Sequence, residues 1–132
     1  MLSFEEAREA LSDIADSLPR QLYKDLCGGV ILLPRAKLHP GTQDLYILGE
    51  YHYDPCGFGR YIALYYGSFR RVFGNRKTDD EMIEEMGATL RHELTHHIES
   101  LAGDKSLEYE DEARLEDYYR SRRAYDDGGK DL

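Results

Sequence analysis

The residues whose types and spacing could do chemistry together are His92, Glu93 and His96, which form the pattern His-Glu-x-x-His. Two histidines four residues apart lie about 6 Å apart along a helix, so both imidazole rings can reach one ion. This spacing suits tetrahedral zinc, and the intervening glutamate can act as general base toward a metal-bound water. We therefore predict one Zn²⁺ per chain, with His92 and His96 as ligands and Glu93 as the catalytic residue. The plain alternative is a helix that happens to carry three histidines, since His97 follows directly.

A catalytic zinc ion takes three protein ligands and keeps one position open for water. The chain after the motif is densely acidic, with Glu108, Asp111 and Glu112 among its residues. A chain that turns back toward His92 needs several residues before it is level with the ion again. Glu108 is therefore the predicted third ligand, with Asp111, Glu112 and Asp104 as alternatives. Any one of these carboxylates could instead belong to a solvated helix face.

Three other side chains near these patterns have simpler interpretations. His97 lies about 100° round the helix from His96, and we expect it to contact a core neighbour or a carboxylate. Glu50 and His52 share a face of a strand and could bind a metal, although such a pair is more typical of an exposed strand surface.

A long helix must position the motif. Thr78 is a suitable N-cap with Glu81 three residues later, which is the spacing of a capping box. Apolar residues then recur at helical spacing up to Gly103. They are Met82, Met86, Leu90, Leu94, Ile98 and Leu101. A neighbouring polar stripe is typical of a half-buried cleft wall. It consists of Thr89, His92, Glu93, His96 and Ser100.

The first half of the chain predicts a helix followed by a small sheet. Ser3 and Glu6 form a capping box for a helix that ends at Ser17, and Pro19 opens a short second helix. Strands are predicted over 30–33, 45–53 and 60–69, with a loop over 35–44, and the last two strands form an antiparallel hairpin. A final helix is expected over 106–124. The predicted fold is thus α+β, one domain over 1–125 with a disordered acidic tail over 126–132.

Composition excludes several classes of partner. The chain has 132 residues and a net charge of −9, which repels nucleic acid and anionic membrane surfaces. No apolar run approaches the length of a membrane span, and the N-terminus lacks the order of a secretory signal. Cys27 and Cys56 are therefore expected to be reduced thiols, and the expected compartment is the cytoplasm.

The residues after the motif exclude two known classes of zinc-binding protein. A metzincin would need Gly at position 99, His or Asp at 102 and a downstream methionine turn. This chain has Glu99 and Ala102, and its methionines all precede the motif. Ala102 also breaks the three-histidine pattern of certain metal-dependent endoribonucleases. A zincin with a carboxylate as third ligand remains.

The chain resembles the minimal zincin-like metallopeptidases of bacteria. The resemblance rests on the run 92–97, with its doubled histidine, and on the strand-like runs 48–51 and 61–69 before it. The segments 99–103 and 107–111 after the motif also contribute, so that roughly residues 1–120 are covered. Many relatives have Phe-Gly where this chain has Ile98-Glu99, a departure that leaves the third ligand open. The resemblance implies an N-terminal helix, a small twisted sheet of three to four strands, the zinc helix and a C-terminal helix.

The function implied is hydrolysis of peptide bonds in a peptide or protein substrate, by a monomer or weak oligomer. In zincins the strand before the active helix presents its backbone to an extended substrate. Here that strand is 60–69, so Gly67 and Ser68 are predicted substrate contacts. Tyr65 is a candidate oxyanion donor, with Tyr66 and Tyr109 as alternatives. Two alternatives remain open. One is a catalytically silent zincin-fold module that recognises a peptide segment along its edge strand, and the other is a hydrolase of a non-peptide amide.

Overall fold

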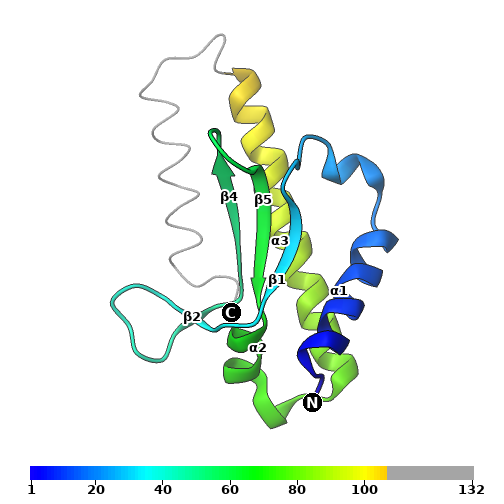
Figure 1. The fold of residues 1–132 in the computed structure, drawn as a ribbon, viewed down its shortest axis with the longest axis vertical. Helices are drawn as coiled ribbons and strands as arrows, with labels where there is room; N and C mark the ends of the chain where they lie inside the picture. The colour runs from blue at the N-terminus through cyan, green and yellow to red at the C-terminus, as the bar shows by residue number, and fades with distance from the viewer. Residues whose placement is uncertain (107–132) are drawn as a thin grey trace.

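The structure is a computed structural model that describes residues 1–106, with side chains through residue 103. It shows an α+β fold in which three α-helices accompany a small mixed sheet, as the sequence predicts (Figure 1). The predicted helix over 106–124, the tail over 126–132 and the boundary at residue 125 lie outside the described residues. Among the residues described, no helix combines the length and apolar character needed to cross a membrane.

Helix α1 (Phe4–Ser17) begins with the predicted capping box, since Ser3 and Glu6 exchange side-chain-to-backbone hydrogen bonds. Its buried face includes Ala7 and Leu11, with Phe4 and Ile14 partly buried against the same core. A 3₁₀ turn, η1 (Arg20–Tyr23), follows Pro19 and leads to the first strand.

The main sheet has the strand order β1-β5-β4. Strands β4 (Gly49–Asp54) and β5 (Gly59–Tyr65) form the predicted antiparallel hairpin, and β1 (Gly29–Leu33) pairs in parallel with β5. The central strand is therefore β5. The strand predicted over 30–33 is present as β1, but it lies at the edge of the sheet and is only partly buried, since Ile31 is 39% exposed. Two short strands, β2 (Lys37–Leu38) and β3 (Tyr46–Ile47), form a second small sheet where a loop and the start of a longer strand were predicted.

The predicted strand over 60–69 ends four residues early. Residues from Tyr66 onward form helix α2 (Tyr66–Phe73), which leads through the 3₁₀ turn η2 (Gly74–Arg76) to the long helix. Tertiary contacts outweigh strand propensity here. The Tyr66 hydroxyl donates to the carbonyl of Leu2, the Tyr66 ring lies edge-on to Phe4, and Phe69 is 1% exposed. The partner strand β1 also ends opposite Tyr65, so the sheet offers no further pairing on that side.

Helix α3 (Asp79–Ser106) crosses one face of the sheet and packs beside α1 (Figure 1). The predicted Thr78–Glu81 capping box is present, but the helix continues three residues beyond Gly103. The buried stripe of α3 includes Leu90 and Leu94, which join Ile62 and Leu64 of β5 in the main core.

The prediction that Ile98 belongs to the buried apolar stripe of α3 is wrong. Ile98 is 45% exposed, whereas His97 is 0% exposed. Four residues of an α-helix turn through about 400°, so each step of four moves a side chain about 40° away from the core-facing side. After several such steps up to Leu94, the next core-facing position is therefore three residues on, at His97, and not four residues on, at Ile98. The polar stripe is also more buried than expected, because Thr89, Glu93, His96 and Ser100 are all buried.

Candidate metal centre

The side chains of His92 and His96 converge on one turn of α3. Their Nε2 atoms lie 3.2 Å apart, with the two rings nearly perpendicular. Two nitrogens bound at 2.0–2.1 Å to a tetrahedral zinc ion are about 3.3 Å apart, so the observed separation fits a shared ion. The same separation also permits one ring to donate a hydrogen bond to the other, which is the arrangement expected of a histidine pair without metal.

Glu93 completes a compact group with the two histidines. Potential ligand atoms of His92, Glu93 and His96 all lie within 4.8 Å of one another. The glutamate side chain is 0% exposed and lies beneath the start of β4, where a Cβ atom on Gly49 would be 3.5 Å from Glu93 Cγ. Imidazole nitrogens and a carboxylate are the donor set that zinc prefers, so the residues present fit that ion.

A further carboxylate lies behind the pair. Glu99 Oε1 is 3.4 Å from Nδ1 of His96, one turn along the same helix. The carboxylate stands on the side of the ring where the carboxylate–histidine–zinc arrangement places its partner, at ion-pair distance and not at hydrogen-bond distance. Glu99 was not among the site residues predicted from the sequence.

The third ligand is not defined by the described residues. Glu108, Asp111 and Glu112 lie outside them, so their assignment stays a prediction. Asp104 belongs to α3, and a rise of 1.5 Å per residue puts its backbone about 12 Å along the axis from His96. That separation disfavours Asp104 as a ligand of the same ion.

His97 has a structural role, as the sequence suggested. Its Nε2–H donates to the carbonyl of Lys24 at 2.6 Å, and its Nδ1 accepts from the Tyr51 hydroxyl at 2.9 Å. Burial lowers the pKa of His97. The Tyr51 oxygen also accepts from Arg60, whose guanidinium donates to Ser100. This network ties α3 to the hairpin and to Lys24, the residue that follows η1, next to the motif.

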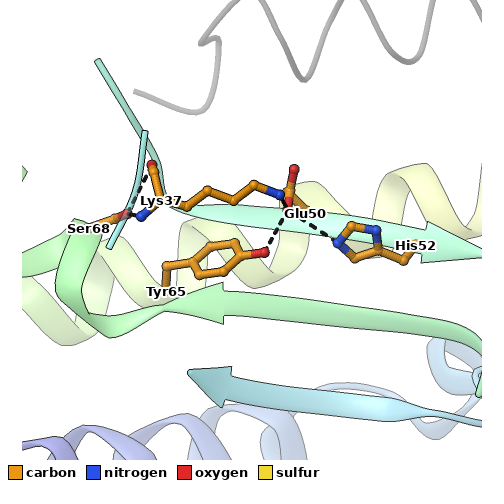
Figure 2. Close-up of polar contacts among 5 residues, drawn as sticks. All are labelled: Lys37, Glu50, His52, Tyr65 and Ser68. Atoms are coloured by element: carbon orange, nitrogen blue, oxygen red, sulfur yellow. Dashed lines mark hydrogen bonds and ion pairs between the residues drawn. The ribbon is translucent and has the colours of Figure 1, made fainter. Parts of the chain in front are cut away.

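The three predicted substrate contacts do not join the histidine pair. Gly67 and Ser68 were predicted to contact substrate because they were expected to lie in a strand. They belong instead to helix α2, so that reason does not hold. Gly67 instead lets the backbone of 35–36 approach closely, since a Cβ there would meet Ala36 N at 2.4 Å. The Ser68 hydroxyl accepts from the Lys37 amide, and the Tyr65 hydroxyl donates to Glu50 on the sheet face away from α3 (Figure 2).

Gly49 is a site residue that the sequence reasoning missed. A Cβ atom at this position would lie 2.7 Å from Thr89 Cγ2, closer than side chains approach one another. Only a glycine lets β4 pack this tightly on the turn of α3 that carries Glu93. The signal in the sequence was a glycine within an otherwise β-prone run, which often marks a close backbone approach.

Comparison with known proteins gives a structural relative without an assigned activity. No family model matches the chain, and neither does any curated protein. Among solved structures, a conserved hypothetical protein from Thermus thermophilus matches with a TM-score of 0.67 and 37% sequence identity. The match covers 77% of this chain and 99% of the Thermus chain. On this identity and coverage, the chain belongs to the same family as that conserved hypothetical protein.

Proposed function

We propose that the chain is a zinc-dependent hydrolase of peptide bonds, with a zincin-like fold. The observation that carries this proposal is the 3.2 Å separation of the Nε2 atoms of His92 and His96, with Glu93 between them in the sequence and beside them in space. Helical spacing alone would bring the two rings near one another, but not both Nε2 atoms to one point.

Each residue of the group has a distinct task in this proposal. His92 and His96 hold the ion, and Glu99 orients His96 through Nδ1. When bound, zinc supplies Lewis-acid chemistry, by lowering the pKa of water and by polarising a carbonyl. Glu93 accepts the proton released by the attacking water and returns it to the leaving amine.

The strand that would bind an extended substrate is not the one that the sequence indicated. Both edges of β5 are paired, one with β1 and one with β4, so its backbone has no edge left for a substrate. Among the described strands of the main sheet, β1 and β4 each pair along only one edge, and of these two it is β4 that begins beside Glu93, at Gly49. We assign β4 as the strand that an extended substrate would join.

A second candidate function rests on the burial of Glu93. A side chain that is 0% exposed is poorly placed to exchange a proton with an incoming substrate. This favours a zincin-fold binding module, in which the group holds a structural metal or serves packing alone.

The test is the metal content of tag-free protein, measured for the wild type, for a His92→Ala/His96→Ala variant and for Glu93→Gln. A His39→Ala variant is the matched control, because His39 lies in the turn after β2. We expect about one zinc per chain in the wild type, Glu93→Gln and His39→Ala, and none in the double variant.

Each metal-loaded protein is then incubated with a peptide library, and products are identified by mass spectrometry. Cleavage by the wild type but not by Glu93→Gln would support the peptidase. Zinc without cleavage would favour the binding module, and no zinc in the wild type, even after zinc is added, would overturn the metal site.

A further inference from the structure

The second face of the main sheet carries a set of side chains that the metal centre does not use. Along β5, Ile62 and Leu64 point into the core beneath α3, so Tyr61, Ala63 and Tyr65 point to the opposite face. Figure 2 shows this face, with Lys37, Glu50, His52 and Tyr65 in front of the strands and α3 behind them.

A cavity of about 310 Å³ opens on this face. Its floor is aliphatic, formed by Ile31, Leu33 and Ala63, and its walls are aromatic. Two wall rings, His52 and Tyr61, stack with centroids 4.8 Å apart. The volume is at the lower end of the range typical of small-molecule sites, about 300–1,000 Å³, and suits a ligand built on a single ring.

One end of the cavity is positively charged. Arg35 and Lys37 both line it, and none of the carboxylates described up to residue 103 does. Lys37 is neutralised by Glu50, whose Oε1 lies 2.6 Å from the Lys37 ammonium. The Arg35 guanidinium stands over the Tyr65 ring, 5.4 Å from its centroid, and no carboxylate of the described residues pairs with it. In a chain with a net charge of −9, this unneutralised cation beside an apolar floor favours an anion.

The polar end of the cavity is held in place before any ligand arrives. A single oxygen, Glu50 Oε1, accepts from Lys37 Nζ at 2.6 Å, from the Tyr65 hydroxyl at 2.6 Å and from His52 Nε2 at 3.2 Å. These bonds connect β2, β4 and β5 and fix the orientation of two cavity walls. A preformed wall reduces the conformational cost of binding.

We propose that this cavity binds a small aromatic carboxylate. The ring lies on the aliphatic floor between the aromatic walls, where offset and edge-on ring contacts are available. The carboxylate meets Arg35, which can donate two parallel hydrogen bonds to it. The site lies across the sheet from His92 and His96, so the proposal is independent of the metal centre.

The test uses 3-phenylpropionate as probe and the full chain labelled with ¹⁵N, with amide shifts recorded during titration. Two matched compounds replace the carboxylate with a neutral or a cationic group, namely 3-phenylpropan-1-ol and 3-phenylpropylamine. We expect saturable shifts at Ile31 and Ala63 with the acid, binding roughly ten-fold weaker with the alcohol, and none with the amine.

The matched variants are Arg35→Gln and Arg20→Gln, both of which change exposed arginines, with Arg20 on η1 away from the cavity. Arg35→Gln should weaken binding of the acid roughly ten-fold, and Arg20→Gln should leave it unchanged. Equal affinity for acid and alcohol, saturable shifts confined to other elements, or no saturable shift with the wild type would each overturn the proposal. The comparison of the three compounds needs only the wild type, so it holds even where a variant misfolds.

Discussion

Replacing Gly49 by alanine tests whether the close approach of β4 to α3 sets the geometry of the candidate site. The added Cβ would lie 2.7 Å from Thr89 Cγ2, about 1 Å inside a normal carbon–carbon contact. Overpacking of this size costs about 1–3 kcal/mol of the free energy of unfolding. At about 4 °C per kcal/mol for a chain of this length, the melting temperature should fall by roughly 4–12 °C.

A second substitution locates the cause of that loss. Thr89→Ser removes the methyl group that the new Cβ would strike, and it keeps the hydroxyl that donates to the Glu85 carbonyl. Alone it should cost about 1 kcal/mol for the lost buried methyl group. Together with Gly49→Ala it should cost less than the sum of the two single changes, by about 1–2 kcal/mol.

The assay is urea unfolding followed by circular dichroism, for the two single variants and the double variant. Gly87→Ala is the matched control, because the nearest atoms to its added Cβ would be Arg91 Nη1 at 3.2 Å, the end of a flexible side chain, and Ile14 Cγ2 at 3.7 Å. That change should raise stability by about 0.5–1 kcal/mol, since glycine is a poor helix former. Strict additivity of Gly49→Ala and Thr89→Ser would refute the argument, because the clash would then lie elsewhere.

The remaining predictions concern the two hydrogen-bonded networks of the hairpin. Burial acts to raise the pKa of Glu50, but hydrogen bonds from His52, Lys37 and Tyr65 outweigh it and lower the pKa from 4.5 to about 2. The carboxylate therefore stabilises the fold fully above pH 4.5, by about 3 kcal/mol, and this is lost as the pH falls toward 2. Glu50→Gln should lower stability at pH 7 and flatten its fall between pH 4.5 and 2, as measured by urea unfolding at each pH; an unchanged slope would contradict the assignment. Tyr51→Phe should cost about 1–3 kcal/mol, because it removes the hydroxyl between Arg60 and His97 in a buried setting. Tyr46→Phe, which leaves that network intact, should cost much less in the same assay, and equal losses would show that the network contributes nothing.

Local signals in the sequence predicted the elements that carry the motif. The capping boxes at Ser3 and Thr78 are both present, because a capping box needs only residues three positions apart. The β4–β5 hairpin was predicted for a similar reason, since its turn is encoded by adjacent residues. Contacts between residues three to ten positions apart can therefore be predicted from the sequence.

Features that depend on distant residues were missed. The change from strand to helix at Tyr66 depends on contacts with Leu2 and Phe4, more than sixty residues away. A core contact was expected for His97, but its actual partners, the Lys24 carbonyl and the Tyr51 hydroxyl, are 73 and 46 residues away and were not identified. In the candidate site the histidine pair was predicted from its spacing, whereas Gly49 was not, because its role exists only where β4 meets α3.

The order of strands in the main sheet also has a consequence for how the chain folds. In the β4–β5 hairpin, four residues separate the paired residues Asp54 and Gly59. In the β1–β5 pair, Gly29 lies opposite Tyr61, so the paired residues are far apart in the sequence. Loop closure is slower and costs more entropy over the longer separation, so the hairpin should form first and β1 should dock late. Residues of β1 form part of the floor of the cavity on the second face, which therefore exists only after this last pairing. A ligand in that cavity would hold the late strand in place and slow hydrogen exchange of its amides, while the hairpin amides would change little.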